Sequence, residues 1–297
     1  MVRVGAGNFT YDVIEGWGAL PESVSFGHIS DVSVDSYDRV YCFQRQAPSI
    51  VVLDDRGNYL KSWGDDPMAY AHGISLGSDA SVYLTYRDEH LAIKCSEDGN
   101  LILSLGNKGV PSEATYEGDP ATTVRAAVKV IKAGGPFNRP CKLVSSPSGD
   151  LYVADGYSNS RVHRFSEKGK LKMSWGQPGK VEPGQFHVPH SVFVDENGIV
   201  YVCYRENNRV QIFTQEGEFL AQWNQFGRPS GVFFDQHGRI YVADSESDNV
   251  QNPGWEMGIR IGEVETGWVT EFILYPWGDP RDVAGNCLLY TSDAADE

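Results

Sequence analysis

The sequence predicts an all-β protein, a six-bladed β-propeller that is C-terminally truncated in its last blade. One unit recurs in five imperfect copies through most of the 297 residues, and each copy contains several short strands. Aligning the core tyrosine of each copy gives spacings of 42, 69, 49 and 40 residues; these tyrosines are Tyr41, Tyr83, Tyr152, Tyr201 and Tyr241. A period near 40 with several strands per copy is typical of a propeller and not of a helical array.

The fourth copy, residues 186–223, indicates what one unit builds. Its segment HSVFVD predicts a first strand, and the turn ENG leads into a second strand, IVYVCY. An Asn-Gly pair between two such runs signals a tight hairpin. The polar segments RENN and TQEG then set off two more strands, RVQIF and EFLAQW. Each copy is therefore expected to form one blade of four antiparallel strands.

The same pattern sets the predicted blade boundaries. The five blades are expected at about 22–64, 65–106, 136–176, 184–224 and 226–275. A glycine precedes the last strand in four copies, where it supplies the positive φ of a tight turn; these are Gly57, Gly99, Gly169 and Gly217. The large residues that end these strands are expected to pack between blades; they are Trp63, Leu105, Trp175 and Trp223.

A sixth blade is expected to be shared between the two ends of the chain. Residues 9–21 resemble the last strand of a copy and predict the strand that closes blade six. The tail 287–297, CLLYTSDAADE, departs from the repeat and resembles translated read-through of a sequencing adapter in a metagenomic gene sequence, so it is a non-native tail in this interpretation. We expect the natural gene to continue past about Asn286 with three more strands.

The repeat predicts a single propeller domain over 1–286, interrupted by an insertion at 107–135 between blades two and three. The insertion is either a solvated surface excursion or a substrate lid. No apolar run approaches the ~18 residues of a membrane span, and the first residues lack the apolar core of a secretory signal. The expected location is cytoplasmic, or periplasmic or secreted if the true N-terminus is missing.

Charge and motifs exclude several classes of function. The formal net charge of −15 repels phosphate backbones, so nucleic acid is not an expected partner. The five cysteines have no paired spacing, which suits a reducing compartment. The sequence also has no phosphate-binding glycine loop, no paired-cysteine metal motif and no nucleophile elbow.

Strand direction predicts which residues converge. In a four-stranded meander, the loop before strand one and the loop between strands two and three lie at the same end of the blade. The first column of residues in these loops is Ser30, His72, Cys141, His190 and Ser230. The second column is Arg45, Arg87, Gly156, Arg205 and Ser245, with Tyr157 one place beyond Gly156.

These columns suggest a metal site. His72 and His190 hold matching positions in blades two and four, and alternate blades of a six-bladed ring make a three-fold arrangement. Three imidazoles and an open position form a catalytic zinc pattern, in which the third histidine would belong to blade six. Cys141 is either a soft ligand or ordinary buried packing. In the opposing interpretation, each histidine is an ordinary polar loop residue.

Two arginines and a tyrosine could complete an active site. Arg45 and Arg205 could clamp a substrate carboxylate, although rim arginines also pair with neighbouring acids. Tyr157 is the candidate general base, since a metal and arginines would lower the pKa of its phenol. For Arg87 a local ion pair with the adjacent Asp88 is the favoured interpretation.

At these residues the chain resembles a known family. The segments DGYSNSRVHRFSEKGKLKMSWG, PGQFHVPHSVFVDENG and YRENNRVQIF are similar to NHL repeats, and roughly Gly27 to Asp244 resembles the NHL propeller of the peptidyl-α-hydroxyglycine α-amidating lyases and their bacterial relatives. In that family a zinc ion on three histidines, with a tyrosine and two arginines, cleaves a peptidyl-α-hydroxyglycine to a peptide amide and glyoxylate. The resemblance implies zinc ligands at His72 and His190, a base at Tyr157, and a clamp at Arg45 and Arg205.

The sequence also departs from that family. Arg281 stands where a loose alignment puts the third histidine, in the final blade. The disulfide that braces the tyrosine loop in the lyases is missing, with Asn138 and Ser158 at its positions. The segment 243–262 resembles bacterial propellers of unknown activity more than it resembles the lyases.

The sequence therefore favours a metal-dependent propeller enzyme of lyase type. Its substrate would be a small carboxylate-bearing or α-hydroxylated molecule or short peptide at the channel mouth, with zinc as the expected cofactor. One alternative is a non-catalytic NHL-repeat binding module or scaffold with a protein partner. Another is a lactonase-like hydrolase that uses calcium.

Overall fold

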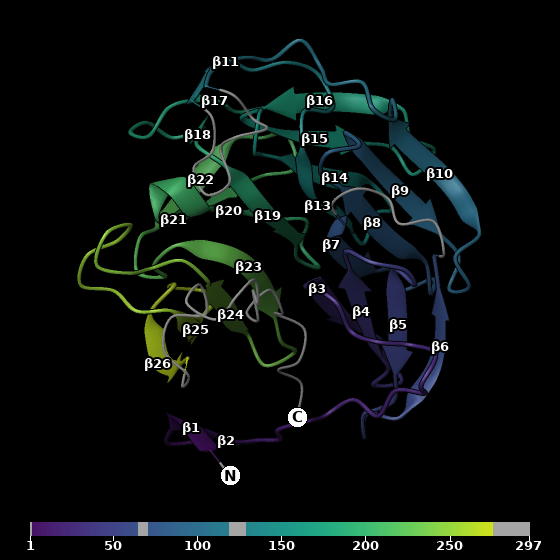
Figure 1. Cartoon of the computed structure of the whole chain (residues 1–297). Helices are drawn as coiled ribbons and strands as arrows, with labels where there is room; N and C mark the ends of the chain where they lie inside the picture. The colour runs from purple at the N-terminus through teal and green to yellow at the C-terminus, as the bar shows by residue number, and fades with distance from the viewer. Residues whose placement is uncertain (1, 65–70, 119–128, 276–297) are drawn as a thin grey trace. The chain divides into compact units, whose positions relative to one another are not determined.

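The structure is a computed structural model that describes residues 2–64, 71–118 and 129–275 (Figure 1). These residues form twenty-six β-strands and, within the described ranges, a single short 3₁₀ helix, η1 (Arg205–Asn207). The all-β prediction is confirmed. The chain divides into two compact units, Met1–Pro67 with Gln225–Glu297, and Met68–Asn224. Over the described ranges, no helix is long and apolar enough to span a membrane.

The unit Met68–Asn224 contains three four-stranded antiparallel sheets, which we call blades two, three and four. Within each blade, strands that follow one another in sequence are neighbours in the sheet. The strands of blade two are β7 (Ala71–Leu76), β8 (Val82–Tyr86), β9 (Leu91–Cys95) and β10 (Leu101–Gly106). Those of blade three are β13 (Pro140–Ser145), β14 (Leu151–Asp155), β15 (Arg161–Phe165) and β16 (Leu171–Trp175). Those of blade four are β19 (Pro189–Val194), β20 (Val200–Tyr204), β21 (Arg209–Phe213) and β22 (Phe219–Trp223).

The unit Met1–Pro67 with Gln225–Glu297 contains two sheets of the same design and an N-terminal hairpin. Blade one is formed by β3 (Ile29–Val34), β4 (Val40–Gln44), β5 (Ile50–Leu53) and β6 (Tyr59–Trp63). Blade five is formed by β23 (Pro229–Phe234), β24 (Arg239–Asp244), β25 (Gly258–Glu263) and β26 (Val269–Leu274). The hairpin joins β1 (Val2–Ala6) to β2 (Phe9–Val13).

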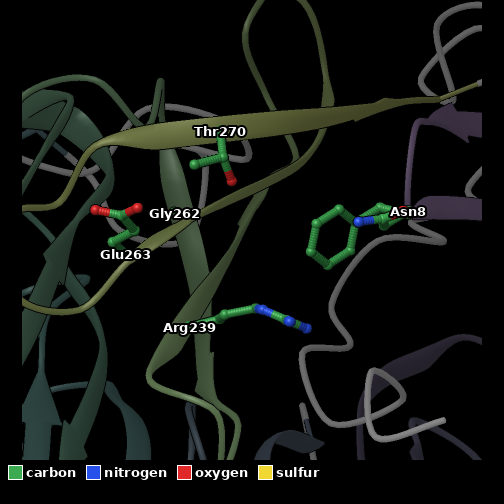
Figure 2. A pocket seen from close by; sticks show the side chains of 6 residues that line it. Asn8, Arg239, Gly262, Glu263 and Thr270 are labelled. Carbon is green, nitrogen blue, oxygen red and sulfur yellow. The ribbon is translucent and has the colours of Figure 1, made fainter.

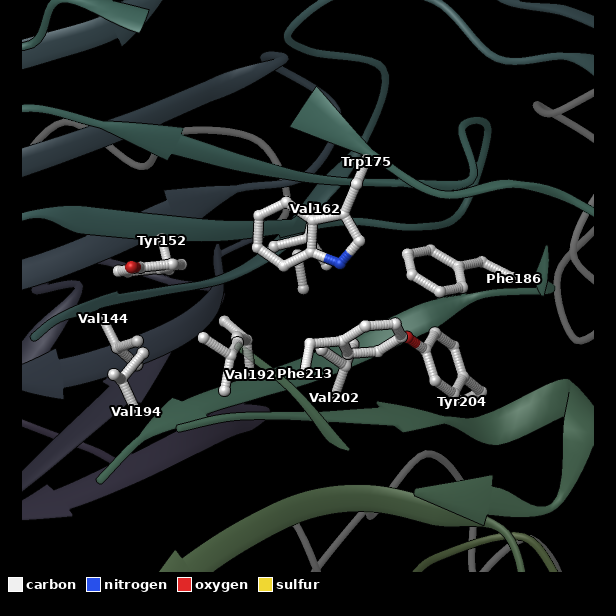
Figure 3. Close-up of a cluster of buried hydrophobic side chains, with 12 residues drawn as sticks. Val144, Tyr152, Val162, Trp175, Phe186, Val192, Val194, Val202, Tyr204 and Phe213 are labelled. Atoms are coloured by element: carbon white, nitrogen blue, oxygen red, sulfur yellow. The ribbon is translucent and has the colours of Figure 1, made fainter. Parts of the chain in front are cut away.

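Apolar residues from blades three and four fill the space between their sheets (Figure 3). Trp175 at the end of β16 is 8% exposed and lies close to Phe213, at 6.1 Å between ring centroids. Gly217, before the last strand of blade four, has φ +77°, and a Cβ on it would lie 3.0 Å from the indole of Trp175. The turn glycine therefore serves both the turn and the packing of the preceding blade.

The prediction of six blades is wrong for the described residues, which contain five four-stranded sheets. Residues 9–21 were predicted to close blade six, but Phe9–Val13 pairs with Val2–Ala6 instead. Arg3 faces Asp12 across this hairpin in an ion pair of 2.7 Å. A hairpin partner a few residues away needs little loop closure, which favours this local pairing. The three strands predicted beyond Asn286 and the tail 287–297 lie outside the described residues.

Strand β1 of the hairpin lies beside β26 of blade five. A cavity of about 360 Å³ separates part of the hairpin from the blade, with Asn8 on one side and Arg239 and Thr270 on the other (Figure 2). The guanidinium of Arg239 is 5.0 Å from the ring centroid of Phe9. Further along, Trp17 packs over Gly57 of blade one, as Trp175 packs over Gly217.

The insertion after blade two contributes a second hairpin. Strand β11 (Thr115–Glu117) pairs with β12 (Lys129–Lys132), and β12 lies next to β17 (Gln177–Pro178). Strand β17 pairs in parallel with β18 (Gln185–Phe186) just before blade four. The described parts of the insertion therefore pack on the connection between blades three and four.

Candidate functional site

Four of the predicted site residues meet at the hydroxyl of Tyr157. Nε2 of His72 lies 3.3 Å from the hydroxyl oxygen, and Nε2 of His190 lies 3.1 Å from it. Nη1 of Arg205 donates a hydrogen bond of 3.2 Å to the same oxygen. The two imidazole rings are 4.9 Å apart between centroids. All four residues belong to the unit Met68–Asn224, so one compact body holds this site.

Strand ends position these side chains. His72 is the second residue of β7 and His190 is the second residue of β19, so both stand where a first strand begins. Tyr157 follows the end of β14, and Arg205 follows the end of β20 directly. In an antiparallel meander these points lie at the same end of each blade, and this order brings the residues together. The backbone amide of Arg205 also donates to the carbonyl of Val188, at 3.3 Å.

A backbone carbonyl fixes the orientation of His72. Nδ1 of His72 is 2.9 Å from the carbonyl oxygen of Cys141, which can only accept, so Nδ1 carries the proton. The hydroxyl of Thr85 donates to the same carbonyl at 2.7 Å. The lone pair of Nε2 on His72 therefore faces Tyr157. Metal-ligating histidines are commonly held by such a hydrogen bond on the far ring nitrogen.

Two glycines allow the strands to approach this closely. A Cβ on Gly73, next to His72, would clash with the carbonyl oxygen of Cys141. A Cβ on Gly156, next to Tyr157, would clash with the carbonyl of Pro189, which precedes His190. Neither glycine is required for a turn with positive φ, since what each one provides is space. In each of the segments AHGI and DGYS, the candidate site residue therefore stands next to the glycine that allows the neighbouring strand to approach.

Cys141 takes part through its backbone. Burial raises the pKa of its thiol to about 12, so the thiol keeps its proton at neutral pH. Its Sγ lies 3.7 Å from the carbonyl of Arg139. These properties suit a packed side chain.

Arg87 was set aside in the sequence interpretation, but it lies at the site. Its guanidinium is 4.9 Å from the ring centroid of Tyr157, while that of Arg205 is 5.2 Å away. The expected ion pair with Asp88 also forms, at 3.0 Å, and Arg139 shares the same carboxylate at 3.2 Å. Burial alone would lower the pKa of Arg87, but Tyr157 and Asp88 outweigh it and raise that pKa. The shared column with Arg205 was the signal that could have identified Arg87.

Arg45 belongs to the other compact unit, so its predicted part in a clamp stays a prediction. It follows the end of β4, and its backbone amide donates to the carbonyl of His28 at 2.9 Å.

Hydrogen bonds brace the loop of Tyr157. The amide of Ser158 donates to the carbonyl of Asn138 at 3.3 Å, so the two positions of the family's disulfide are neighbours here. The buried carboxylate of Asp155 accepts from the backbone amide of Asn138 at 3.0 Å and from the side chain of Asn159 at 2.7 Å. His163 completes this network, 3.2 Å from Asp155.

Comparison with known proteins agrees with this architecture. Residues 137–165 match the NHL repeat, a stretch that includes β14, the Tyr157 loop and β15. This chain is a β-propeller that contains an NHL repeat. The NHL propeller is 31% identical over 230 residues to human NHL repeat-containing protein 3, a match that covers 72% of this chain and 60% of that protein. It is 27% identical over 251 residues to peptidyl-alpha-hydroxyglycine alpha-amidating lyase 1 of Drosophila melanogaster, covering 73% of this chain and 43% of that protein.

The NHL propeller thus spans less than two thirds of the length of either relative. Among solved structures, a protein of unknown function from Bacteroides caccae is similar, with a TM-score of 0.61 and 12% identity. That match covers 96% of this chain and 89% of the other chain, and at this identity it speaks for the fold alone.

The donor set fits a metal ion in part. Two imidazole nitrogens converge on one point, and the carbonyl of Cys141 sets the tautomer of His72. Within the described ranges, no group of three or more His, Cys, Asp or Glu side chains surrounds a common point. Arg281, at the position of the family's third histidine, lies outside those ranges.

Proposed function

We propose that this NHL propeller is a zinc-dependent lyase that acts on a small α-hydroxylated carboxylate or on a short peptide ending in one. The observation that supports this most is the convergence of His72, His190 and Arg205 on the hydroxyl of Tyr157. The similarity to the Drosophila lyase supports the reaction class. His72 and His190 would hold the metal, and a bound zinc ion would polarise the substrate oxygen.

Tyr157 would move the proton. In the cleavage of an α-hydroxyglycine, the O–H and C–N bonds break while a C=O and an N–H bond form, so the reaction needs no oxidant. The hydroxyl proton must leave oxygen and a proton must reach the departing nitrogen, and one base close to both can do this. Arg205 donates to the phenol oxygen at 3.2 Å, and a cation in that position would stabilise the negative charge of the base.

The arginines would bind the substrate carboxylate. Arg205 is 2% exposed and Arg87 lies against the same tyrosine ring, so both are partly removed from water. A guanidinium in such surroundings binds a carboxylate more strongly than an exposed lysine does. The ion pair with Asp88, at 3.0 Å, holds the guanidinium of Arg87.

Glyoxylate release from a peptidyl-α-hydroxyglycine tests this function. We expect the purified protein with zinc to release glyoxylate, and Tyr157→Phe to slow the release about 100-fold or more, as loss of a general base does. His237→Ala changes an exposed turn histidine and serves as the control. An unchanged rate in Tyr157→Phe would contradict the proposed base.

A non-catalytic binding propeller is the second candidate. The similarity to NHL repeat-containing protein 3, whose name states no activity, favours it. Under this alternative, the protein with zinc releases no glyoxylate above the rate of free zinc. For the calcium-dependent hydrolase, carboxylates would be expected at the column positions where His72 and His190 stand, because calcium prefers oxygen ligands.

A further inference from the structure

A second cavity lies in the same unit as Tyr157. Its volume is about 590 Å³, and its wall combines two lysines with apolar side chains. The lining residues used in the argument below are Lys129, Lys180, Ser160, Val130, Pro178 and Phe186. Its walls come from the insertion strand β12 and from the connection between blades three and four. A pocket with a cationic rim and apolar walls fits an amphipathic anion.

This cavity adjoins the loops of the candidate site. Ser160 follows Tyr157 by three residues and His187 precedes His190 by three, so each pair of Cα atoms is at most about 10 Å apart. Strand β15 starts, and β16 ends, at the end of blade three where Tyr157 lies. The lining residues Ser160 and Pro178 therefore lie at the same end of blade three as Tyr157.

Hydrogen bonds connect the walls of the cavity to the site. The side chain of Asn207 in η1, the helix that begins with Arg205, donates to the carbonyl of Gly179 at 3.1 Å. Next to the wall residue Ser160, Asn159 accepts from the amide of Gly134 at 3.0 Å and donates to the carbonyl of Gly135 at 3.2 Å. The insertion and the Arg205 helix are thus both fixed to the loops that frame the cavity.

One wall residue indicates that a polar ligand group belongs in the cavity. Ser160 is fully buried, and its Oγ makes no hydrogen bond within the described part of the chain. A buried hydroxyl without a partner costs free energy, which a ligand group can recover. Lys180 is exposed and makes no ion pair within those ranges, whereas Lys129 pairs with Glu117 at 3.0 Å.

We propose that this cavity binds the remote part of the substrate, an apolar group that bears a second carboxylate. Lys180 would pair with the carboxylate, Ser160 would donate a hydrogen bond, and Val130 with Phe186 would contact the apolar group. The proposal rests on the proposed function only in calling this ligand part of the substrate. Binding to the cavity can be measured without any reaction.

Calorimetric titration with 4-phenylbutanoate tests the cavity, with neutral 4-phenylbutanamide as the matched ligand. We expect the acid to bind about threefold to tenfold more tightly than the amide, and Lys180→Met to remove that preference. Ser160→Ala should weaken both ligands slightly. Lys168→Met alters an exposed lysine in the turn at the other end of blade three and should change nothing.

Two outcomes separate this proposal from the proposed function. The double variant His72→Ala with His190→Ala should lose zinc and still bind 4-phenylbutanoate as the unaltered protein does. If the unaltered protein holds no zinc but binds the acid through Lys180, the metal proposal fails and the cavity stands. If the acid does not bind saturably, or binds Lys180→Met equally well, the cavity proposal is wrong whatever the zinc content.

Discussion

Blades four and five are built alike but treat their polar loop residues differently. In blade four, His190 and Arg205 extend to Tyr157 of blade three. In blade five, the corresponding Ser230 and Ser245 hydrogen-bond to each other. A polar residue whose partner lies in its own blade stabilises that blade, whereas one whose partner lies in the next blade is available for a site. The repeat supplies the positions, and a few loop residues decide which of them can carry chemistry.

The largest expected difference between blades four and five is in how a substitution in each blade changes zinc affinity. Loss of a residue that only hydrogen-bonds to a metal ligand typically lowers metal affinity by ~10–100-fold. We expect His190→Ala to weaken zinc binding by more than that, because it removes a ligand itself. Ser230→Ala, at the same column position in blade five, should leave zinc affinity unchanged. Competition with a zinc chelator measures both, and equal affinity in the two variants would remove the distinction between the blades.

Two buried arginines give the next largest contrast. Arg205→Met should reduce glyoxylate release by about 10- to 100-fold, because a buried hydrogen bond to a charged group is worth about 1.5–3 kcal/mol. Arg228 of blade five is 3% exposed and pairs with Glu246 at 3.0 Å. Arg228→Met should lower the unfolding free energy and leave turnover of the folded protein intact. A loss of turnover in both variants would mean that both arginines act through stability.

A smaller effect tests the close approach of blades two and three. Gly73→Ala would place a Cβ against the carbonyl of Cys141, and we expect it to destabilise the protein by about 1–3 kcal/mol and to weaken zinc binding. Gly135→Ala is the matched control, since a Cβ there meets nothing within 4 Å. Denaturant unfolding of the two variants gives the difference, and equal stabilities would show that the space beside His72 is not needed.

The smallest effect concerns the pH dependence of stability. Burial raises the pKa of Asp244 in blade five, although Ser247 and Arg260 oppose it. The pKa of this carboxyl is therefore higher in the folded protein than in the unfolded chain. Its contribution to the unfolding free energy falls as pH rises through the folded-state pKa. In blade three, burial acts in the same direction on Asp150, but Lys172 and Arg164 outweigh it and lower the pKa, so that contribution is lost as pH falls through the lowered pKa.

Unfolding free energies from pH 3 to 6 would measure these slopes. Asp150→Asn should reduce the loss of stability in acid, while Asp244→Asn should steepen it. A change of slope in the same direction in both variants, relative to the unaltered protein, would contradict the opposite environments of the two carboxyls.

The sequence predicted the strands well because the pattern of each strand recurs in several copies of the repeat. It also predicted the meeting of His72, His190, Tyr157 and Arg205, since strand order in a meander determines which loops share an end. It did not predict that Phe9–Val13 pairs with Val2–Ala6, a partner only a few residues away.

Other features of the site had no sequence signal of their own. The sequence showed Asp88 beside Arg87, but it could not show that one guanidinium pairs with that acid and also lies against a tyrosine ring. The part played by Cys141 depends on its carbonyl, which every residue has. The contact between Asn138 and Ser158 is made by backbone atoms, so the identity of their side chains does not predict it.

Zinc K-edge absorption spectroscopy of the zinc-loaded protein tests the central claim most directly. The account predicts imidazole scattering from two histidines, with Zn–N distances of about 2.0–2.1 Å, that is reduced by His72→Ala and again by His190→Ala. A spectrum that neither substitution changes would place the zinc elsewhere, and the convergence on Tyr157 would then be a structural contact and not a metal centre.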